Sequence, residues 1–191
     1  MKIKFQCILT LIFIFSLSCK PNTLDCKIKT AEGNIKIELY PDKAPNTVAN
    51  FLHYVDNNLY ENSSFFRVCN NENEDDRDVK IEVIQGGNID ETKSLPPIKM
   101  EHTQQTGIKH LNGTISMARM GPDTATSQFF ICINDQPELD YQGKRNPDGQ
   151  GFAAFGKVTK GMDVVLKINS QKDEGQYLIN PVMINSITRI E

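Results

Sequence analysis

Residues 127–133 read Ser127-Gln128-Phe129-Phe130-Ile131-Cys132-Ile133, an apolar run with one amide directly before two aromatic rings. This pattern predicts a β-strand. Successive side chains of a strand point to opposite faces, so Gln128 and Phe130 lie on one face and Phe129 lies on the other. We therefore expect one ring to pack in the core and the other to line a pocket.

Short strands and two helices are predicted along the rest of the chain. Alternating apolar residues favour a hairpin around Glu32-Gly33-Asn34, where Gly33 supplies the positive φ of a tight turn. Apolar residues recur at helical spacing after Ala44-Pro45 and again over Gly161–Ile168. Further strands are predicted at 65–68, 81–87, 113–119 and 182–190. Many short strands with few helices favour a closed antiparallel barrel, because closure removes the sheet edges.

Length and charge set limits on the function. The 191 residues are enough for one domain whose core needs neither metal nor disulfide. The formal net charge is −3 and no dense Lys/Arg cluster occurs, which argues against nucleic acid binding through phosphate neutralisation.

Cysteine spacing predicts neither a zinc site nor a redox motif, because no Cys-x-x-Cys pair occurs. The five cysteines are Cys7, Cys19, Cys26, Cys69 and Cys132. A disulfide among the last three stays open, although none is predicted. We expect no metal and no cofactor.

The first residues have the pattern of a secretory signal. Two lysines precede an apolar run at 8–15, which is too short to be a comfortable membrane span. Ser18-Cys19 at the end of that run is similar to a bacterial lipobox, although Ser16 and Leu17 depart from its usual order. Cys19 is therefore the expected lipidation site and the first residue of the mature protein.

These patterns divide the chain into a signal peptide (1–18), a tether (19–25) and a folded domain (26–191). The expected location is the cell envelope, facing the periplasm or the exterior, with the membrane reached only through the lipid. Plain signal cleavage and an uncleaved anchor are the alternatives.

Four separated motifs occur in the order found in one protein family. They are Ser64–Val68, where an arginine sits between apolar neighbours, Val83–Gly87, the run 127–133, and Gly151–Val158. Together they resemble the cyclophilin family of peptidyl-prolyl cis/trans isomerases over about Cys26 to Glu191. The resemblance implies a mainly β fold, a closed eight-stranded antiparallel barrel with two covering α-helices. It also implies isomerisation of X-Pro bonds in proline-containing polypeptides.

The resemblance assigns roles position by position. Arg67 matches the catalytic arginine, Phe130 the aromatic floor of the proline pocket, and Gln85 the glutamine that orients substrate and arginine. A guanidinium suits this task because it is always charged and presents rigid donors. The other expected substrate-binding residues are Phe66, Val83, Ala118, Arg119, Gln128, Leu139 and Phe152.

Several positions depart from the family's pattern. Val83 replaces a usual methionine and Glu82 a usual phenylalanine, so one pocket wall is expected to be smaller or polar. Arg119 replaces a common asparagine, and Phe152 stands where many relatives have histidine or tyrosine. Glu138 stands where cyclosporin-sensitive members have a tryptophan that donates a hydrogen bond, which predicts weak binding of that drug.

Two other functions stay open. If Glu82 has removed most of the catalytic turnover, the chain would be a chaperone module that binds proline-containing peptides in the same groove. A purely structural surface lipoprotein is the third possibility, and it predicts no peptide binding. No pattern favours an oligomer, and we expect a monomer.

Two polar features are interpreted without a catalytic role. The acidic run at 70–80 lacks the internal glycine and terminal glutamate of a hand-type calcium loop, so a solvated loop is predicted. His53, His102 and His110 show no ligand spacing and are expected to be exposed.

Overall fold

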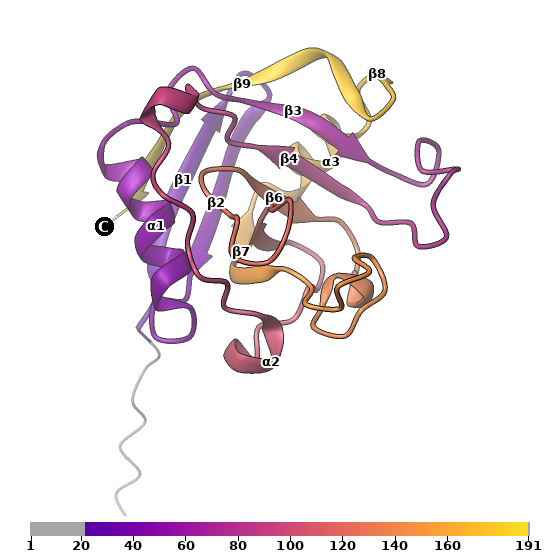
Figure 1. The fold of residues 1–191 in the computed structure, drawn as a ribbon. Coiled ribbons are helices and arrows are strands. Elements are labelled where there is room, and N and C mark those ends of the chain that lie inside the picture. Colours follow the sequence, from indigo (N-terminus) through magenta and orange to yellow (C-terminus); the bar gives the residue numbers. More distant parts are fainter. Residues whose placement is uncertain (1–21, 191) are drawn as a thin grey trace, which may run out of the picture.

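Eight antiparallel strands close into a barrel in the computed structural model, which describes residues 22–190 (Figure 1). Round the barrel they follow the order β1 (Leu24–Thr30), β2 (Gly33–Leu39), β7 (Ala153–Lys160), β5 (Thr114–Met117), β6 (Phe129–Cys132), β4 (Val83–Gly86), β3 (Ser64–Cys69) and β9 (Tyr177–Ile190). The ring closes because β9 pairs again with β1. A two-residue strand, β8 (Asp173–Glu174), makes a hairpin with the start of β9. The predicted closed barrel is confirmed.

Two helices pack on the barrel, as predicted. The first, α1 (Pro45–Asp56), contacts β7 and β9, and α3 (Met162–Asn169) contacts β2, β3 and β4. A third helix, α2 (Thr103–Thr106), was not predicted, because four residues are too few to show an apolar period. Short 3-10 turns lie at η1 (Glu91–Lys93) and η2 (Pro137–Leu139).

The N-terminus of α1 is capped by a side chain that is distant in sequence. Pro45 occupies the first turn, where its missing N–H costs nothing. The N–H groups of Asn46 and Thr47 donate to the two carboxylate oxygens of Glu101 at 3.1 and 2.8 Å. Glu101 therefore provides the N-terminal cap that no residue of the helix supplies.

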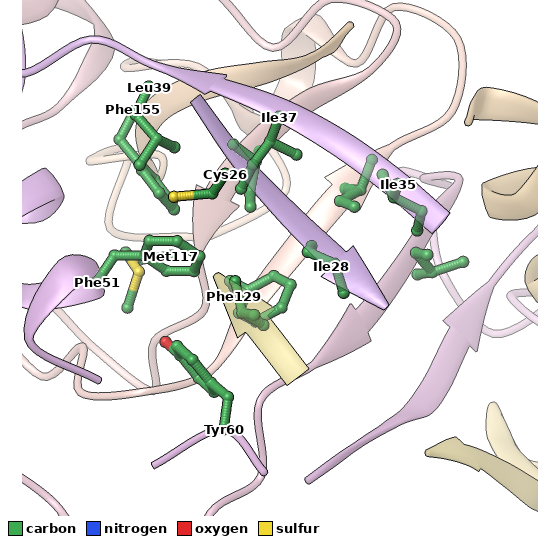
Figure 2. Close-up of a cluster of buried hydrophobic side chains, with 14 of the residues drawn as sticks. Cys26, Ile28, Ile35, Ile37, Leu39, Phe51, Tyr60, Met117, Phe129 and Phe155 are labelled. Atoms are coloured by element: carbon green, nitrogen blue, oxygen red, sulfur yellow. The ribbon is translucent and has the colours of Figure 1, made fainter. Parts of the chain in front are cut away.

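The two aromatic rings of β6 lie on opposite faces, as the alternation predicted. Phe129 is fully buried inside the barrel, edge-on to Phe51 and Tyr60 (Figure 2). It is also edge-on to Phe65. Phe130 belongs to a separate apolar cluster outside this core. The core thus holds one face of β6, and the other face is left to build a site.

Element bounds differ from the predicted ones at both ends of the domain. β1 begins at Leu24, so the last residues of the predicted tether belong to the barrel. β9 begins at Tyr177 rather than at 182, because its first residues pair with β8 and with β3. The predicted signal peptide and Cys19 lie outside the described residues. In the part of the chain that the structure describes, no helix has the length and apolar character needed to cross a membrane.

Candidate active site

A pocket of about 620 Å³ opens beside β3, β4 and β6. All ten residues predicted from the sequence to form the site line it. They are Phe66, Arg67, Val83, Gln85, Ala118, Arg119, Gln128, Phe130, Leu139 and Phe152. Residues from three strands, from the turn η2 and from the segments next to β5, β6 and β7 therefore meet at one place.

The floor of the pocket is aromatic and apolar. Phe130 is 5% exposed, and Phe152 stands edge-on to it with ring centroids 5.2 Å apart. His110 lies nearly parallel to Phe130, at 6.0 Å between ring centroids. Leu139 is fully buried in the same cluster. Such a floor fits a flat, apolar group of the size of a proline ring.

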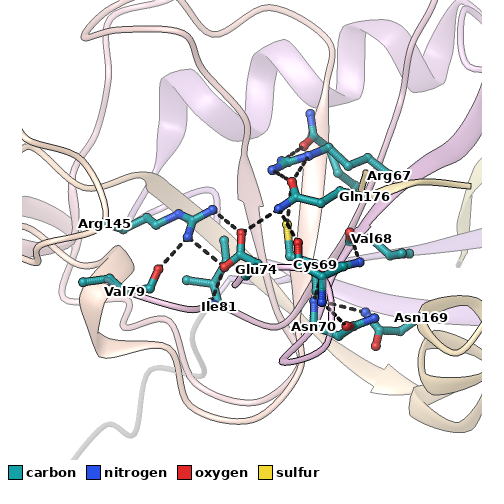
Figure 3. A network of polar contacts seen from close by, with 12 residues as sticks. Arg67, Val68, Cys69, Asn70, Glu74, Val79, Ile81, Arg145, Asn169 and Gln176 are labelled. Carbon is teal, nitrogen blue, oxygen red and sulfur yellow. Dashed lines mark hydrogen bonds and ion pairs between the residues drawn. The ribbon is translucent and has the colours of Figure 1, made fainter. Parts of the chain in front are cut away.

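Glutamine side chains hold the Arg67 guanidinium. Arg67 Nη1 donates to Gln85 Oε1 at 2.8 Å, and Arg67 Nε donates to Gln176 Oε1 at 3.0 Å. Arg67 Nη2 donates to the same oxygen of Gln176 (Figure 3). Gln85 is held in turn, because its Nε2 donates to Gln128 Oε1 at 2.9 Å.

The count of donors shows what Arg67 can still offer. A guanidinium has five N–H groups and no acceptor. Three of them are engaged by Gln85 and Gln176, which leaves two without a partner among residues 22–190. Because Arg67 lines the pocket, the site presents free N–H donors of a guanidinium beside an apolar floor.

Sequence reasoning missed several residues that line the pocket, among them Ile81, Gln176 and Tyr177. Ile81 could have been found, because it precedes Val83 by two positions and therefore points to the same face. Gln176 lies in the β8–β9 hairpin, outside the four family motifs, and the residues next to it in sequence give no signal of a role in the site.

The expectation of a polar pocket wall at Glu82 is wrong. Ile81 and Val83 face the pocket, both buried, and Glu82 between them points to the other side of the strand. There its carboxylate accepts a hydrogen bond from Asn134 Nδ2 at 2.7 Å. The wall is apolar, which removes the argument that Glu82 suppresses turnover.

The acidic run is only partly solvated, contrary to the prediction. Asp75, Asp76 and Asp78 are exposed, but Glu74 is 1% exposed and forms an ion pair with Arg145. Burial disfavours the charged carboxylate, yet the hydrogen bonds from Arg145 and from the backbone N–H of Ile81 keep the pKa of Glu74 below its ordinary value.

A second loop, 143–151, is fastened to the pocket by Arg119. Its guanidinium donates to both oxygens of Asp148, at 2.7 and 2.9 Å, and to the carbonyl of Gly151 at 2.8 Å. It also lies over the Phe152 ring, 5.1 Å from the centroid. Arg119 thus lines the pocket as predicted, with three of its five donors and its ion pair committed to the loop.

His110 is buried, whereas the sequence predicted it to be exposed. Its Nδ1 lies 2.9 Å from Asp140 Oδ1 and its Nε2 lies 3.0 Å from Ser116 Oγ. A carboxylate only accepts, so Nδ1 carries the proton and Nε2 accepts from the hydroxyl. Burial is the main reason that the pKa of His110 is lowered, although Asp140 opposes it. A neutral imidazole therefore supports the floor below Phe130.

The cysteines of the described chain are thiols. Cys26, Cys69 and Cys132 are buried and unpaired with one another, and burial raises the pKa of Cys26 and of Cys69 to about 12. Among residues 22–190 no group of three or more His, Cys, Asp or Glu side chains is placed to hold a metal ion.

Comparison with known proteins agrees with this geometry. The family described as "Cyclophilin type peptidyl-prolyl cis-trans isomerase/CLD" matches residues 25–189. The "Peptidyl-prolyl cis-trans isomerase" of Acinetobacter baylyi is 42% identical over 160 residues, which cover 81% of this chain and 76% of that protein. "Peptidyl-prolyl cis-trans isomerase B" of Escherichia coli is 39% identical over 144 residues, or 73% and 80% of the two chains.

Solved structures have the same fold. A cyclophilin type peptidyl-prolyl cis-trans isomerase of Cryptosporidium parvum matches with a TM-score of 0.70 at 24% identity, covering 89% of this chain and 99% of that one. The same parasite protein was also solved in the presence of the dipeptide Ala-Pro, and it matches with a TM-score of 0.69.

Proposed function

The chain belongs to the cyclophilin-type peptidyl-prolyl cis-trans isomerases, and on this premise we propose that it isomerises X-Pro bonds of exported polypeptides, with Arg67 as the catalytic residue. Substrates are proline-containing segments that enter the pocket with the proline ring on Phe130. One observation carries the assignment: Arg67 offers two free N–H donors beside an aromatic floor.

The reaction needs no nucleophile. Amide resonance sets a barrier of about 18 to 20 kcal/mol to rotation about the X-Pro bond, while the two isomers differ by only about 0.5 to 1 kcal/mol. At the top of the barrier the prolyl nitrogen loses its conjugation and gains a lone pair. A donor held at that nitrogen stabilises the twisted state more than either planar isomer, which is the requirement for catalysis.

The described residues divide this task. Phe130, Phe152 and Leu139 hold the proline ring, so rotation takes place in the chain that precedes it. Arg67 donates to the prolyl nitrogen, and Gln85 fixes the direction of that donor while its own amide is fixed by Gln128. Lowering the barrier by about 5 kcal/mol gives a rate increase of a few thousandfold.

The N-terminal sequence supports a location outside the cytoplasm. The secretory pattern and Ser18-Cys19 favour export followed by lipidation of Cys19, which places the isomerase at the cell envelope. Slow X-Pro isomerisation limits the folding of many chains, so newly exported proteins are fitting substrates. We expect the enzyme to act as a monomer.

The catalytic assignment is tested by Arg67→Ala in a proline-peptide isomerisation assay. We expect kcat/KM to fall by about 100- to 1000-fold, the usual cost of removing one transition-state donor. Arg189→Ala is the matched control, because Arg189 is exposed and pairs with Asp56 away from the pocket. A wild-type protein that binds peptide without accelerating isomerisation, together with an Arg67→Ala variant that binds equally well, would reject the enzyme in favour of a binding module.

The anchoring proposal has its own test. Intact mass spectrometry of the mature protein from membranes should show a lipid-modified Cys19 at the N-terminus, and Cys19→Ala should release the protein from the membrane fraction. An unmodified first residue other than Cys19 would remove the lipoprotein from the proposal and leave the catalytic assignment untouched.

A further inference from the structure

A chain of hydrogen bonds leads from Arg67 into the acidic run at 70–80. Gln176 Oε1 accepts from Arg67 Nε and Nη2, and Gln176 Nε2 donates to Glu74 Oε1 at 3.1 Å and to the carbonyl of Asn73 at 3.2 Å (Figure 3). Gln176 therefore stands between the guanidinium and the buried carboxylate of the loop, with each end of its amide committed to one of them.

Glu74 is itself held from several sides. Arg145 donates to both of its oxygens, with Nη1 at 2.8 Å from Oε2, and the backbone N–H of Ile81 donates to Oε2 at 2.8 Å. Arg145 also donates to the carbonyl of Val79 at 2.6 Å, which closes the base of the loop. A carboxylate with this many donors and 1% exposure has essentially one available position.

The carboxylate decides which way the amide of Gln176 points. An amide has an acceptor end and a donor end of nearly equal shape, so its orientation depends on its partners. Glu74 and the Asn73 carbonyl can only accept, so together with the donors of Arg67 they turn Nε2 toward the loop and Oε1 toward Arg67. With the amide reversed, an NH₂ group would face the guanidinium, and two donors would oppose each other.

The same logic holds on the other side of the guanidinium. Gln85 presents Oε1 to Arg67 and its Nε2 to Gln128. Arg67 thus donates to two glutamine oxygens, one on Gln85, whose amide is oriented by Gln128, and one on Gln176, whose amide is bound by Glu74. The direction of the two remaining N–H donors of Arg67 depends on its hydrogen bonds to both glutamines.

We propose that Glu74 is a positioning residue for the isomerisation, acting through Gln176 to fix the direction in which Arg67 presents its free donors to the substrate. The acidic run at 70–80 then serves the active site by supplying this carboxylate. The inference rests on the proposed role of Arg67.

The first test compares Glu74→Gln with Glu72→Gln, the same substitution at an exposed position of the same loop. A glutamine at 74 replaces a charged acceptor with a neutral amide that can also donate, so Gln176 Nε2 keeps only the Asn73 carbonyl as an assured acceptor and the orientation of Gln176 is fixed less tightly. We expect kcat to fall about 10- to 100-fold with little change in KM, since small misplacements of a catalytic group cost up to this much. Glu72→Gln should keep its kcat within about twofold of wild type.

A double-mutant cycle separates positioning from general loss of structure. Gln176 is half-buried in the β8–β9 hairpin, and Gln176→Met removes both ends of the amide while keeping a side chain of similar length. If Glu74 acts through Gln176, Glu74→Gln should lower kcat no further in the Gln176→Met background. Should Glu74→Gln fail to fold, Gln176→Met alone must show the fall in kcat, and an unchanged kcat would overturn the proposal.

The Arg67 Nε–H resonance in ¹⁵N NMR provides a readout independent of turnover, and it should shift or broaden in Glu74→Gln but not in Glu72→Gln. An unchanged resonance with unchanged kcat in folded Glu74→Gln, or losses that add fully in the double variant, would overturn the inference. If the catalytic assignment of Arg67 is wrong instead, Arg67→Ala itself would leave turnover unchanged, so the two failures can be told apart.

Discussion

Phe129 and Phe130 are neighbours in sequence, yet the same substitution should have different effects at the two positions. Phe129 is fully buried and edge-on to three rings, with centroids 5.6, 5.6 and 5.8 Å away. Each such pair contributes about 0.5 to 1.5 kcal/mol beyond area burial. Phe129→Leu should therefore lower the free energy of unfolding by about 2 to 4 kcal/mol.

Phe130→Leu removes fewer contacts from the fold and more from the site. Its ring meets Phe152 and His110 and is open to the pocket on its remaining side. The expected loss of stability is about 1 to 2 kcal/mol, from two aromatic pairs. A smaller, non-planar floor should raise KM for a proline peptide about tenfold, the usual effect of imperfect filling of an apolar pocket.

Urea denaturation with a shared m-value gives the two stabilities, and isomerisation assays under fully folding conditions give KM. The expected ranking is opposite in the two measurements: Phe129→Leu is the less stable variant and Phe130→Leu has the higher KM. If Phe129→Leu raised KM as much as Phe130→Leu, the separation between core face and pocket face of β6 would be refuted.

Three further outcomes are expected. Burial lowers the pKa of His110, so below about pH 6.5 the imidazole is protonated in the unfolded chain but not in the folded one. The free energy of unfolding should therefore keep its full His110 contribution above that pH and decrease below it. An imidazole that titrates at 6.5 or higher by NMR would contradict this. Glu138 as a carboxylate cannot donate a hydrogen bond, so cyclosporin should bind weakly in isothermal titration, and tight binding would count against that interpretation. Cys26, Cys69 and Cys132 should react slowly with a thiol reagent in the native protein and rapidly in denaturant, because burial raises the pKa of all three; rapid labelling of the native protein would be inconsistent with their burial.

Much of the fold could be predicted because local periodicity controls where its strands and helices form, whereas the site residues were predicted from the resemblance to a known family. Alternation in 127–133 separated the core ring from the pocket ring, and the apolar spacing after Pro45 located α1. The resemblance to the cyclophilin family named ten residues that the fold brings to one pocket, and five of them lie outside the strands, where alternation does not predict which way a side chain faces.

The errors share a physical cause, which is that the deciding partner is far away in sequence. Glu74 looked solvated because Arg145 and Gln176, which neutralise and bind its carboxylate, lie 71 and 102 positions further along the chain. His110 looked exposed because Asp140 is 30 positions away. Glu82 was misplaced because the family's pattern was carried over to it, although alternation through Val83 turns it away from the pocket toward Asn134, 52 positions further along the chain.

Exchange NMR on a proline peptide at equilibrium tests the central claim most directly, because it reports binding and turnover in one sample. With wild-type protein, cis and trans signals of the peptide should exchange much faster than without enzyme, and the Phe130 and Phe152 ring resonances should shift as peptide is added. Arg67→Ala should keep the ring shifts and lose the exchange. Peptide exchange that persists in Arg67→Ala, or wild-type protein whose ring shifts come without exchange, would contradict the account.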